Sequence, residues 1–505
     1  MTEYRNFING QFVLSESKET VPNVNPANLN DVIAEVRLST RDEAKAAIEA
    51  AQAAFEGWRS TPAPARGRIV AKAAQLMDAA REELAALLTR EEGKTLGESR
   101  GELARSINVV EFCAAEGRRQ NGETIASELP NNFAYTIKQP HGVVACITPW
   151  NFPVAIPVWK IAPALVAGNT VVFKPATLTP GTASRIVELF NEAGLPPGVL
   201  NMVIGSGSVV GDEITNHPYV RAISFTGSNE VGLKMYEQAA RRGIKVQSEM
   251  GGKNPVVILE DADMDLAVES TVQGAFGSTG QRCTATSRAI VVNEVADEFV
   301  KRLVARTEKL IIGDGSDSKT NVGPAVDKHQ FETVLKYLNI GREDGAEMVF
   351  GGRASEPQGV KLAGIKRLDD PALQHGYYLE PTVFDRVTPD MRIAQEEIFG
   401  PVLSVMRARD FDEALHWANN VQFGLSSSIF SNDPNRIFRF IDKIETGMTH
   451  VNSATTGGEA HIPFGGIKGS GLGEREQGST ALDFYQELKV VYMDYTGQKR
   501  TTNIY

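Results

Sequence analysis

Short apolar runs alternate with helical stretches through the centre of the chain. The clearest runs lie at residues 142–148, 169–174, 199–204 and 222–226. Continuous apolar strands are typical of a parallel sheet that is covered on both faces, and the intervening helices supply the cover. A second series has strand patterns at 255–259 and 289–292 and helical patterns at 266–277 and 295–310. The pattern predicts two α/β domains with a hinge at residues 251–255.

Other patterns lie outside these two predicted sheets. Amphipathic helical spacing covers residues 41–58, 66–90 and 102–119. Asn9-Gly10, between two apolar runs, predicts a β-hairpin over residues 6–13. Residues 133–139 and 488–495 alternate like exposed strands, and we expect the second to reach a neighbouring subunit. Residues 351–377 are polar and irregular, which predicts a surface insertion.

The chain has 505 residues and a formal net charge of −11, with acidic and basic residues interspersed. This balance argues against a nucleic-acid or anionic-membrane surface but permits a local basic pocket for a phosphate. The N-terminus lacks a signal-peptide pattern and no apolar run is long enough to cross a bilayer, so we expect a cytoplasmic protein. Cys113, Cys146 and Cys283 show neither CxxC nor metal-ligand spacing, which argues against disulfides and a metal site.

One of these cysteines ends a glycine-rich loop. In the run 276–283, Gly277 and Gly280 precede Arg282 and Cys283. Arg282 and the backbone amides freed by the glycines would help to lower the pKa of the thiol, because the thiolate is the nucleophile. A lone cysteine near a turn is more often a core residue, so the assignment depends on its neighbours.

Two loops lead from a predicted strand into a predicted helix. The run 205–211 has glycines close to a phosphate-binding spacing but misses it by one residue, and a turn without a ligand explains it equally well. The run 225–232 places Gly227 and Ser228 at a helix N-terminus, where free amides and the helix dipole favour anions. Two such loops in one sheet favour a dinucleotide.

Three polar residues follow apolar runs. Lys174 lies at the carboxyl end of a strand, where ligands bind in open α/β sheets, although a solvated lysine is the plain alternative. Glu249 ends a strand-like run and could act as a general base, although most glutamates are only solvated. Asn151 lies in a turn between two prolines, which would fix its amide as a donor or let it bond its own backbone.

Together these segments resemble the aldehyde dehydrogenase superfamily. The similar segments occur in the family's order at 148–153, 173–175, 225–228, 249–254, 280–283, 397–401 and 463–471. The resemblance implies that Cys283 attacks an aldehyde carbon and that Asn151 holds the resulting oxyanion. It also implies that Glu249 activates the water that hydrolyses the thioester.

The resemblance implies an NAD or NADP cofactor. Lys174 and Glu397 would bind the ribose hydroxyls, Ser228 the pyrophosphate, and Phe399 would pack near the nicotinamide ribose. Thr177 stands where members that prefer NAD carry an acidic residue, so we expect NADP acceptance. Further cofactor-binding residues are predicted at Thr148, Trp150, Gly207, Gly211, Phe225 and Gly251.

The resemblance also implies a substrate tunnel, with residues 455–459 at its mouth. Its predicted lining is Phe152, Ile156, Trp159, Arg282, Thr284 and Phe464. Arg282 could bind a distal carboxylate or be tied to a backbone carbonyl. Some members that select succinic semialdehyde have an arginine at the position of Trp159, which disfavours that substrate here. The sequence most resembles α-ketoglutaric semialdehyde dehydrogenases.

The implied fold is α/β, with a Rossmann-like cofactor domain, an α/β catalytic domain and a small β bridging element that forms homodimers or homotetramers. The predicted divisions are 1–128 with 146–252 for the cofactor, 253–455 for catalysis, 129–145 with 484–505 for bridging and 456–483 for the tunnel. Three alternatives are a broad-specificity aldehyde dehydrogenase, a CoA-acylating enzyme and a non-catalytic scaffold. The base Glu249 argues against the second, and the intact set of Cys283, Asn151 and Glu249 argues against the third.

Overall fold

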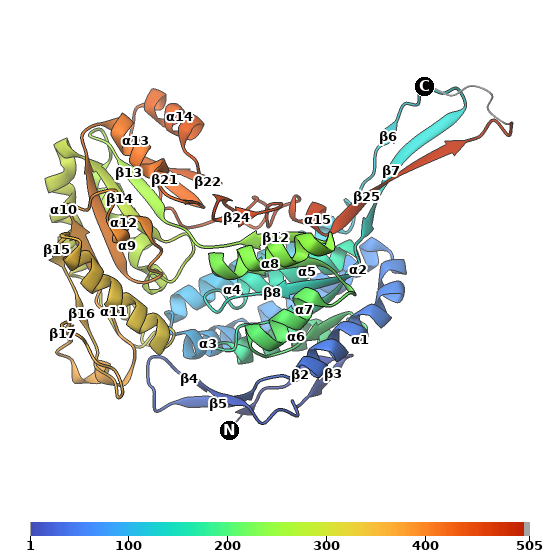
Figure 1. Cartoon of the computed structure of the whole chain (residues 1–505), viewed down its shortest axis with the longest axis horizontal. Helices are drawn as coiled ribbons and strands as arrows, with labels where there is room; N and C mark the ends of the chain where they lie inside the picture. The colour runs from blue at the N-terminus through green and yellow to red at the C-terminus, as the bar shows by residue number, and fades with distance from the viewer. Residues whose placement is uncertain (1, 499–505) are drawn as a thin grey trace.

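The computed structural model describes residues 2–498. Met1 and residues 499–505, the end of the predicted bridging segment, lie outside the described residues. Figure 1 shows two large α/β units side by side and a thin β arm that projects from one of them. No helix in residues 2–498 is both long and apolar enough to cross a membrane.

An eight-stranded sheet forms the first unit. Its order is β24 (Gly471–Leu472), β12 (Lys245–Glu249), β11 (Val220–Thr226), β8 (Val143–Ile147), β9 (Thr170–Lys174), β10 (Leu200–Met202), β2 (Asn6–Ile8) and β3 (Gln11–Val13). The strands from β12 to β10 are parallel, as the apolar runs predicted. The predicted hairpin is confirmed as β2 and β3, with Asn9 and Gly10 at positive φ in its turn.

The order of these strands places a binding crevice. From β8 the chain adds β9 and β10 on one side, then returns to add β11 and β12 on the other. In an open α/β sheet, ligands bind at the carboxyl ends of the strands where the order reverses. Here that point lies between β8 and β11, so the segments after Ile147 and Thr226 meet there.

Both faces of this sheet are covered. Val144 and Cys146 of β8 lie in one apolar cluster with helices α2, α4, α5 and α6, and their neighbours Val143 and Ala145 lie in another with α1, α7 and α8. Thr40 and Glu43 close α1 with a capping box. The helices of this unit are α1 (Arg41–Ser60), α2 (Ala63–Ala79), α3 (Arg81–Glu92), α4 (Leu96–Glu116), α5 (Ala155–Ala167), α6 (Pro180–Glu192), α7 (Asp212–Asn216) and α8 (Asn229–Arg242).

A seven-stranded sheet forms the second unit. Its order is β15 (Glu347–Phe350), β18 (Thr382–Asp385), β19 (Val402–Ala408), β14 (Thr286–Val292), β13 (Asn254–Ile258), β21 (Ser426–Phe430) and β22 (Met448–Val451), and only β15 is antiparallel to its neighbour. Its helices are α9 (Met264–Phe276), α10 (Asn293–Thr307), α11 (Lys328–Glu343), α12 (Arg392–Gln395), α13 (Phe411–Asn419) and α14 (Pro434–Lys443). Both predicted helices, 266–277 and 295–310, are confirmed as α9 and α10.

The projecting arm confirms the two predicted exposed strands. β7 (Asn132–Pro140) pairs along its whole length with β25 (Gln486–Asp494) and also with the short β6 (Thr124–Ile125). The short helix α15 (Ala481–Phe484) precedes β25. A second small sheet orders β1 (Thr2–Glu3), β5 (Val32–Arg37) and β4 (Thr20–Val24), and β20 (Phe423–Gly424) pairs with β23 (Ile467–Lys468).

Two expectations differ from the structure. The pattern over 66–90 gives two helices, because the chain leaves helical geometry at Ala80 (φ −93°, ψ 9°) and α3 starts afresh. The predicted insertion 351–377 holds β16 (Arg353–Ala354), β17 (Lys366–Arg367) and a 3₁₀ turn, and its end packs on the N-terminal segment. The Tyr377 amide donates to the Pro26 carbonyl (3.0 Å) and the Tyr378 hydroxyl to the Ala27 carbonyl (3.0 Å).

Candidate active site

The loop that carries Cys283 is tightly bent. Ser278, Thr279 and Gly280 have φ of 48°, 58° and 67° in the 3₁₀ turn Gly277–Gly280. A Cβ on Gly280 would lie 2.2 Å from the Gly400 carbonyl oxygen, so the two loops approach as closely as backbone permits. Non-glycine residues at positive φ are strained and tend to occur at functional sites. The bend turns the chain back towards β14 and leaves Cys283 at the surface of a cavity.

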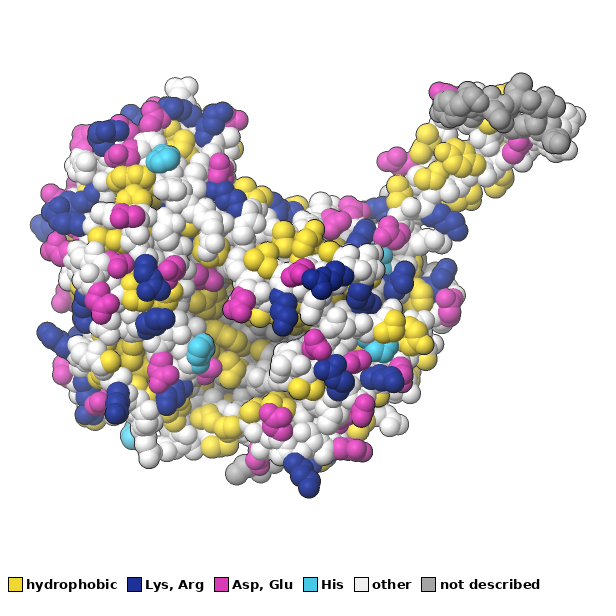
Figure 2. Space-filling model, viewed as in Figure 1, with side chains coloured by type: hydrophobic (Ala, Val, Ile, Leu, Met, Phe, Trp, Pro, Cys, Tyr) yellow, Lys and Arg dark blue, Asp and Glu magenta, His cyan; other side chains and the backbone are white. Residues whose placement is uncertain are grey.

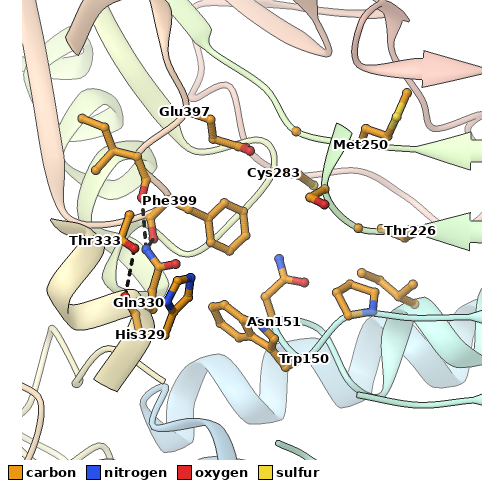
Figure 3. Close-up of a pocket in the computed structure, with 16 residues that line it drawn as sticks. Trp150, Asn151, Thr226, Met250, Cys283, His329, Gln330, Thr333, Glu397 and Phe399 are labelled. Atoms are coloured by element: carbon orange, nitrogen blue, oxygen red, sulfur yellow. Dashed lines mark hydrogen bonds between the residues drawn. The ribbon is translucent and has the colours of Figure 1, made fainter. Parts of the chain in front are cut away.

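This cavity, of about 300 Å³, lies between the two units. Figure 3 shows the side chains of Asn151, Phe399 and Cys283 directed towards one another across it. Asn151 Nδ2 donates to the Gln281 carbonyl (3.1 Å), while its buried Oδ1 has no partner among the described residues. The asparagine that follows β8 therefore reaches across to the loop that holds the thiol.

The thiol is protonated at rest, contrary to the sequence prediction. Burial, followed by the carboxylates of Glu397 and Glu249, raises the pKa of Cys283 to about 12. The cation that opposes this rise in pKa is Arg105 rather than Arg282, with a smaller effect from the Thr284 amide. The expectation of a lowered thiol pKa was wrong because folding places the sulfur in a cavity near two carboxylates, and both burial and negative charge disfavour the thiolate. Attack by the thiol consequently needs a proton acceptor.

Glu249 is the last residue of β12, the strand next to β11. Its Oε2 accepts from the Gly466 amide at 3.2 Å. Burial and the nearby carboxylate of Glu476 raise its pKa well above the ordinary value, against the effect of Lys160. Lys160 contacts Glu476 directly and donates to the Ser224 hydroxyl (2.9 Å). A buried carboxyl of raised pKa binds a proton more readily than an exposed glutamate does, which suits a general base.

A second cavity of about 300 Å³ adjoins the first along Trp150, Thr226 and Ser228. The residues predicted to bind a cofactor all line one of the two: Thr148, Trp150, Lys174, Thr177, Gly207, Gly211, Phe225 and Ser228 line the second, and Gly251, Glu397 and Phe399 line the first. The joined cavities follow the crevice between β8 and β11 out to the loop after β10. Figure 2 shows the hollow between the two units on this face.

The second cavity contains polar groups that suit an elongated polar ligand. The buried hydroxyls of Thr148 and Thr226 have no partner among the described residues. Ser228 precedes the 14-residue helix α8 without capping it through its side chain, and a Cβ at Gly207 would meet nothing within 4 Å. Burial lowers the pKa of Lys174 to about 8. Free hydroxyls, a helix N-terminus and a buried ammonium fit the ribose and pyrophosphate groups of a dinucleotide.

The far end of the first cavity is formed by Glu397 and Phe399. Burial raises the pKa of Glu397 to about 7, although its Oε1 accepts from the Gly252 amide (2.9 Å). Phe399 has a φ of 57°, and its ring meets Trp150 edge-on at 5.6 Å. Gln330 of α11 holds this loop by donating to the Ile398 and Phe399 carbonyls (3.0 and 2.9 Å), as Figure 3 shows.

The predicted tunnel residues do not all line the cavity of Cys283. Ile156 lines the first cavity, and the rings of Trp159 and Phe464 lie 5.4 Å apart. Phe152 packs on a buried lysine, Lys94, and Thr284 is buried with its carbonyl bonded to Thr455. Arg282 is engaged elsewhere.

Arg282 forms an ion pair with Glu98 (3.2 Å) and donates to the Ser278 hydroxyl (2.8 Å). It lines a small void behind Glu397 rather than the cavity of Cys283. The cation among the tunnel aromatics is Arg105 of α4, whose guanidinium lies 5.5 Å from the Trp159 ring and 5.9 Å from Phe464.

Comparison with known proteins agrees with this geometry. The sequence profile of the Aldehyde dehydrogenase family matches residues 12–491. An α-ketoglutaric semialdehyde dehydrogenase of Bacillus subtilis is 45% identical, over 97% of this chain and 98% of the relative. The chain belongs to the aldehyde dehydrogenase family. It is an oxidoreductase that acts on aldehydes.

Further members of the aldehyde dehydrogenase family are similar over their whole length. An α-ketoglutarate semialdehyde dehydrogenase of Haloferax volcanii is 46% identical over 97% of this chain and 99% of the relative. The crystal structure of betaine aldehyde dehydrogenase from Staphylococcus aureus, in complex with NAD⁺, superposes with a TM-score of 0.93 at 36% identity, covering 99% of this chain and 96% of that one. The similarity to the aldehyde dehydrogenase family therefore includes the fold as well as the sequence.

Sequence reasoning missed several residues of this aldehyde dehydrogenase site. Arg105 and Gln330 lie on helices whose patterns mark only an apolar face, and no local motif distinguishes them from solvated residues. Lys160 is the one charged residue of the fully buried helix α5, a signal that the sequence analysis did not use. Glu476 and Lys94 lie in connecting segments. Glu476 comes five residues after the recognised motif 463–471, whereas Lys94 is beside no recognised motif.

Proposed function

We propose that this enzyme oxidises an ω-semialdehyde with a distal carboxylate, such as α-ketoglutaric semialdehyde, to the carboxylic acid. The observation that carries this proposal is Arg105. Its Nε is buried without a partner among the described residues, and only its Gln477 contact (3.1 Å) occupies a terminal nitrogen. A cation without a carboxylate partner in a tunnel lined by aromatic rings favours an anionic substrate. The similarity to two relatives named for this semialdehyde supports the same substrate.

The position of Arg105 suits the far end of a short dioxo acid. Its positive charge lowers the pKa of Cys283, so it lies close enough to act electrostatically on the sulfur. It also lines a hollow of about 600 Å³ whose other walls include Phe112 and residues 458–461. A substrate with its aldehyde at Cys283 would then extend its carboxylate past Trp159 and Phe464 to the guanidinium.

The chain's residues divide the reaction between them. Cys283 gives its proton to Glu249, which passes it to solvent, and the sulfur forms a bond to the aldehyde carbon. The resulting thiohemiacetal oxyanion accepts from the Asn151 amide and the Cys283 amide. When bound, NAD(P)⁺ supplies a hydride acceptor. The thioester left on Cys283 is hydrolysed by water that gives its proton to Glu249, which yields the acid and frees the thiol.

The cofactor is NAD or NADP in this proposal. Lys174 and Glu397 bind ribose hydroxyls, and Ser228 at the start of α8 binds the pyrophosphate. Thr177 lines the second cavity and carries no charge, so nothing at that position repels a 2′-phosphate. The NAD⁺ complex of the Staphylococcus aureus neighbour supports the placement of the dinucleotide in this crevice.

The assembly is a homodimer or homotetramer in this proposal, in the cytoplasm. The arm of β7 and β25 exposes apolar side chains that would be costly to leave in water, among them Phe133, Leu488 and Tyr492. Figure 2 shows hydrophobic side chains gathered along the arm. All three cysteines are free, which suits a reducing compartment. The predicted division into cofactor, catalytic and bridging segments belongs to the same proposal.

The test is cofactor reduction, followed by absorbance, with 2,5-dioxopentanoate, shorter ω-oxo acids and hexanal, each with NAD⁺ and NADP⁺. The proposal expects the dioxo acid to be oxidised far more efficiently than hexanal, and no reduction by Cys283→Ala. Equal efficiencies would retain an aldehyde dehydrogenase of broad specificity and refute the carboxylate assignment. Acyl transfer only in the presence of CoA would refute hydrolysis by Glu249-activated water.

A further inference from the structure

A cluster of buried charges underlies the segment that carries Asn151. Lys94, Glu92 and Glu102 are at most 4% exposed and belong to the α3–α4 region, far from residue 151 in sequence. Lys94 Nζ donates to Glu102 Oε2 at 2.7 Å and to the backbone carbonyl of Asn151 at 2.6 Å. Burying such a pair is costly, so its retention calls for a purpose beyond stability.

The segment between β8 and α5 needs support from outside. Residues 148–154 form neither helix nor strand. The helix α5 lacks a cap of its own, because its N-cap residue is Val154 and makes no side-chain bond. Glu102 supplies the missing acceptor, with Oε1 taking bonds from the Val154 amide (2.9 Å) and the Ala155 amide (3.0 Å).

Lys94 closes the other side of the same segment. Its Nζ lies 4.3 Å from the centre of the Phe152 ring, in addition to its bond to the Asn151 carbonyl. The carbonyl of Asn151, the ring of Phe152 and the amides of Val154 and Ala155 are thus all held by one buried ion pair. Burial alone would lower the pKa of Lys94, but Glu102 and Glu92 outweigh it and hold the pKa above its ordinary value. The lysine stays charged.

We infer that Lys94 and Glu102 are positioning residues that aim the Asn151 side chain at the oxyanion formed on Cys283. The inference rests on the proposed role of Asn151. The side chain of Asn151 has only one bond of its own, to the Gln281 carbonyl, so the direction of its Nδ2 depends on how its backbone is held. Neither Lys94 nor Glu102 needs to touch the substrate for this role. Misplacement of a donor by about 1 Å can cost about a hundredfold in rate.

The experiment compares Lys94→Met, Asn151→Ala and the double variant that combines them. Loss of one oxyanion donor lowers kcat by about 100–1,000-fold, and we expect Lys94→Met to lower it by about 10–100-fold. If Lys94 acts through Asn151, the double variant is no slower than Asn151→Ala alone. The KM for aldehyde and the Kd for NAD⁺ stay close to those of the wild type, and a deuterated aldehyde shows a larger isotope effect on kcat.

Two controls separate positioning from folding. Lys94→Met with Glu102→Gln removes both charges of the ion pair, and the remaining Glu92 can take up a proton because burial raises its pKa to about 7. The glutamine carbonyl still accepts from the amide of Val154 or Ala155. Glu91 is a matched control, because it is also buried and caps α6 by accepting from the Gly181 and Thr182 amides (both 2.8 Å). We expect Glu91→Gln to lower Tm without changing the isotope effect, and the neutral pair to keep the loss in kcat.

Losses in kcat that multiply in the double variant would overturn the inference and leave the proposed function intact. So would a Lys94→Met protein that loses Tm as Glu91→Gln does but keeps the wild-type kcat. An Asn151→Ala variant with unchanged kcat would overturn the inference together with the proposed oxyanion role. The two failures are therefore distinguishable from the same set of variants.

Discussion

Replacing Arg105 by methionine tests the carboxylate site directly. Methionine keeps the apolar stem that packs beside Trp159 and Phe464 and removes the guanidinium. In the structure, this guanidinium is half-buried, has a free Nε and has no ion-pair partner within residues 2–498. Its loss therefore leaves no protein carboxylate unpaired, and the effect falls on the substrate.

The size of the effect follows from this environment. A hydrogen bond to a charged group contributes ~1.5–3 kcal/mol. At about 1.4 kcal/mol for each tenfold, that corresponds to a fall of about 10–150-fold in kcat/KM for 2,5-dioxopentanoate. The contact is the same in the ground and transition states, so KM should rise while kcat changes little. Hexanal has no carboxylate, so its kcat/KM should fall much less, and only because a cation that lowers the pKa of Cys283 is lost.

The assay is steady-state cofactor reduction with both aldehydes for the wild type, Arg105→Met and Arg282→Met. Arg282 is the matched control, since it neighbours Cys283 in sequence but is paired with Glu98. Arg282→Met leaves Glu98 without its partner, so it should lower Tm and affect both aldehydes alike. The reasoning is refuted if Arg105→Met weakens both substrates equally, or if Arg282→Met alone discriminates between them.

Four further predictions follow from the site and the arm. Burial and nearby carboxylates raise the pKa of Cys283 to about 12, so little thiolate is present at about pH 7. Alkylation of the cofactor-free enzyme by iodoacetamide should therefore be slow at about pH 7 and accelerate up to about pH 10. Fast, pH-independent alkylation would contradict the raised pKa. Thr177→Asp should weaken NADP⁺ relative to NAD⁺ by about tenfold or more in kcat/KM, and an unchanged ratio would place the 2′-phosphate elsewhere. Burial lowers the pKa of Lys174 in the free enzyme to about 8, and in the proposed function its charged form binds ribose. NAD⁺ affinity measured by calorimetry should therefore be full below that pH and fall above it, and Lys174→Met should flatten the profile. Tyr492 and Leu488 are 73% and 62% exposed in the single chain, and the variant Tyr492→Glu with Leu488→Glu places charges at both positions. If the arm joins subunits, this variant should have a smaller mass by light scattering. An unchanged mass would exclude the arm from the interface.

The sequence by itself determined the local elements and pointed to the candidate reacting groups. The apolar runs at 142–148 and 222–226 became β8 and β11 because a strand buried on both faces needs continuous apolar side chains. Many of the residues recognised in the motifs between Thr148 and Phe399 line the two joined cavities, among them Asn151, Lys174, Ser228 and Cys283. These features depend on short stretches of chain, where pattern and turn chemistry suffice.

Only the tertiary structure decided which charges face one another. Sequence proximity suggested Arg282 as the cation beside Cys283, but folding pairs it with Glu98 and brings Arg105 towards the sulfur instead. The same packing raised the pKa of the thiol above its ordinary value and brought the Lys94 ammonium to the backbone carbonyl of Asn151. An electrostatic environment depends on burial and on distances between segments remote in the chain, and a pattern along one segment carries neither quantity.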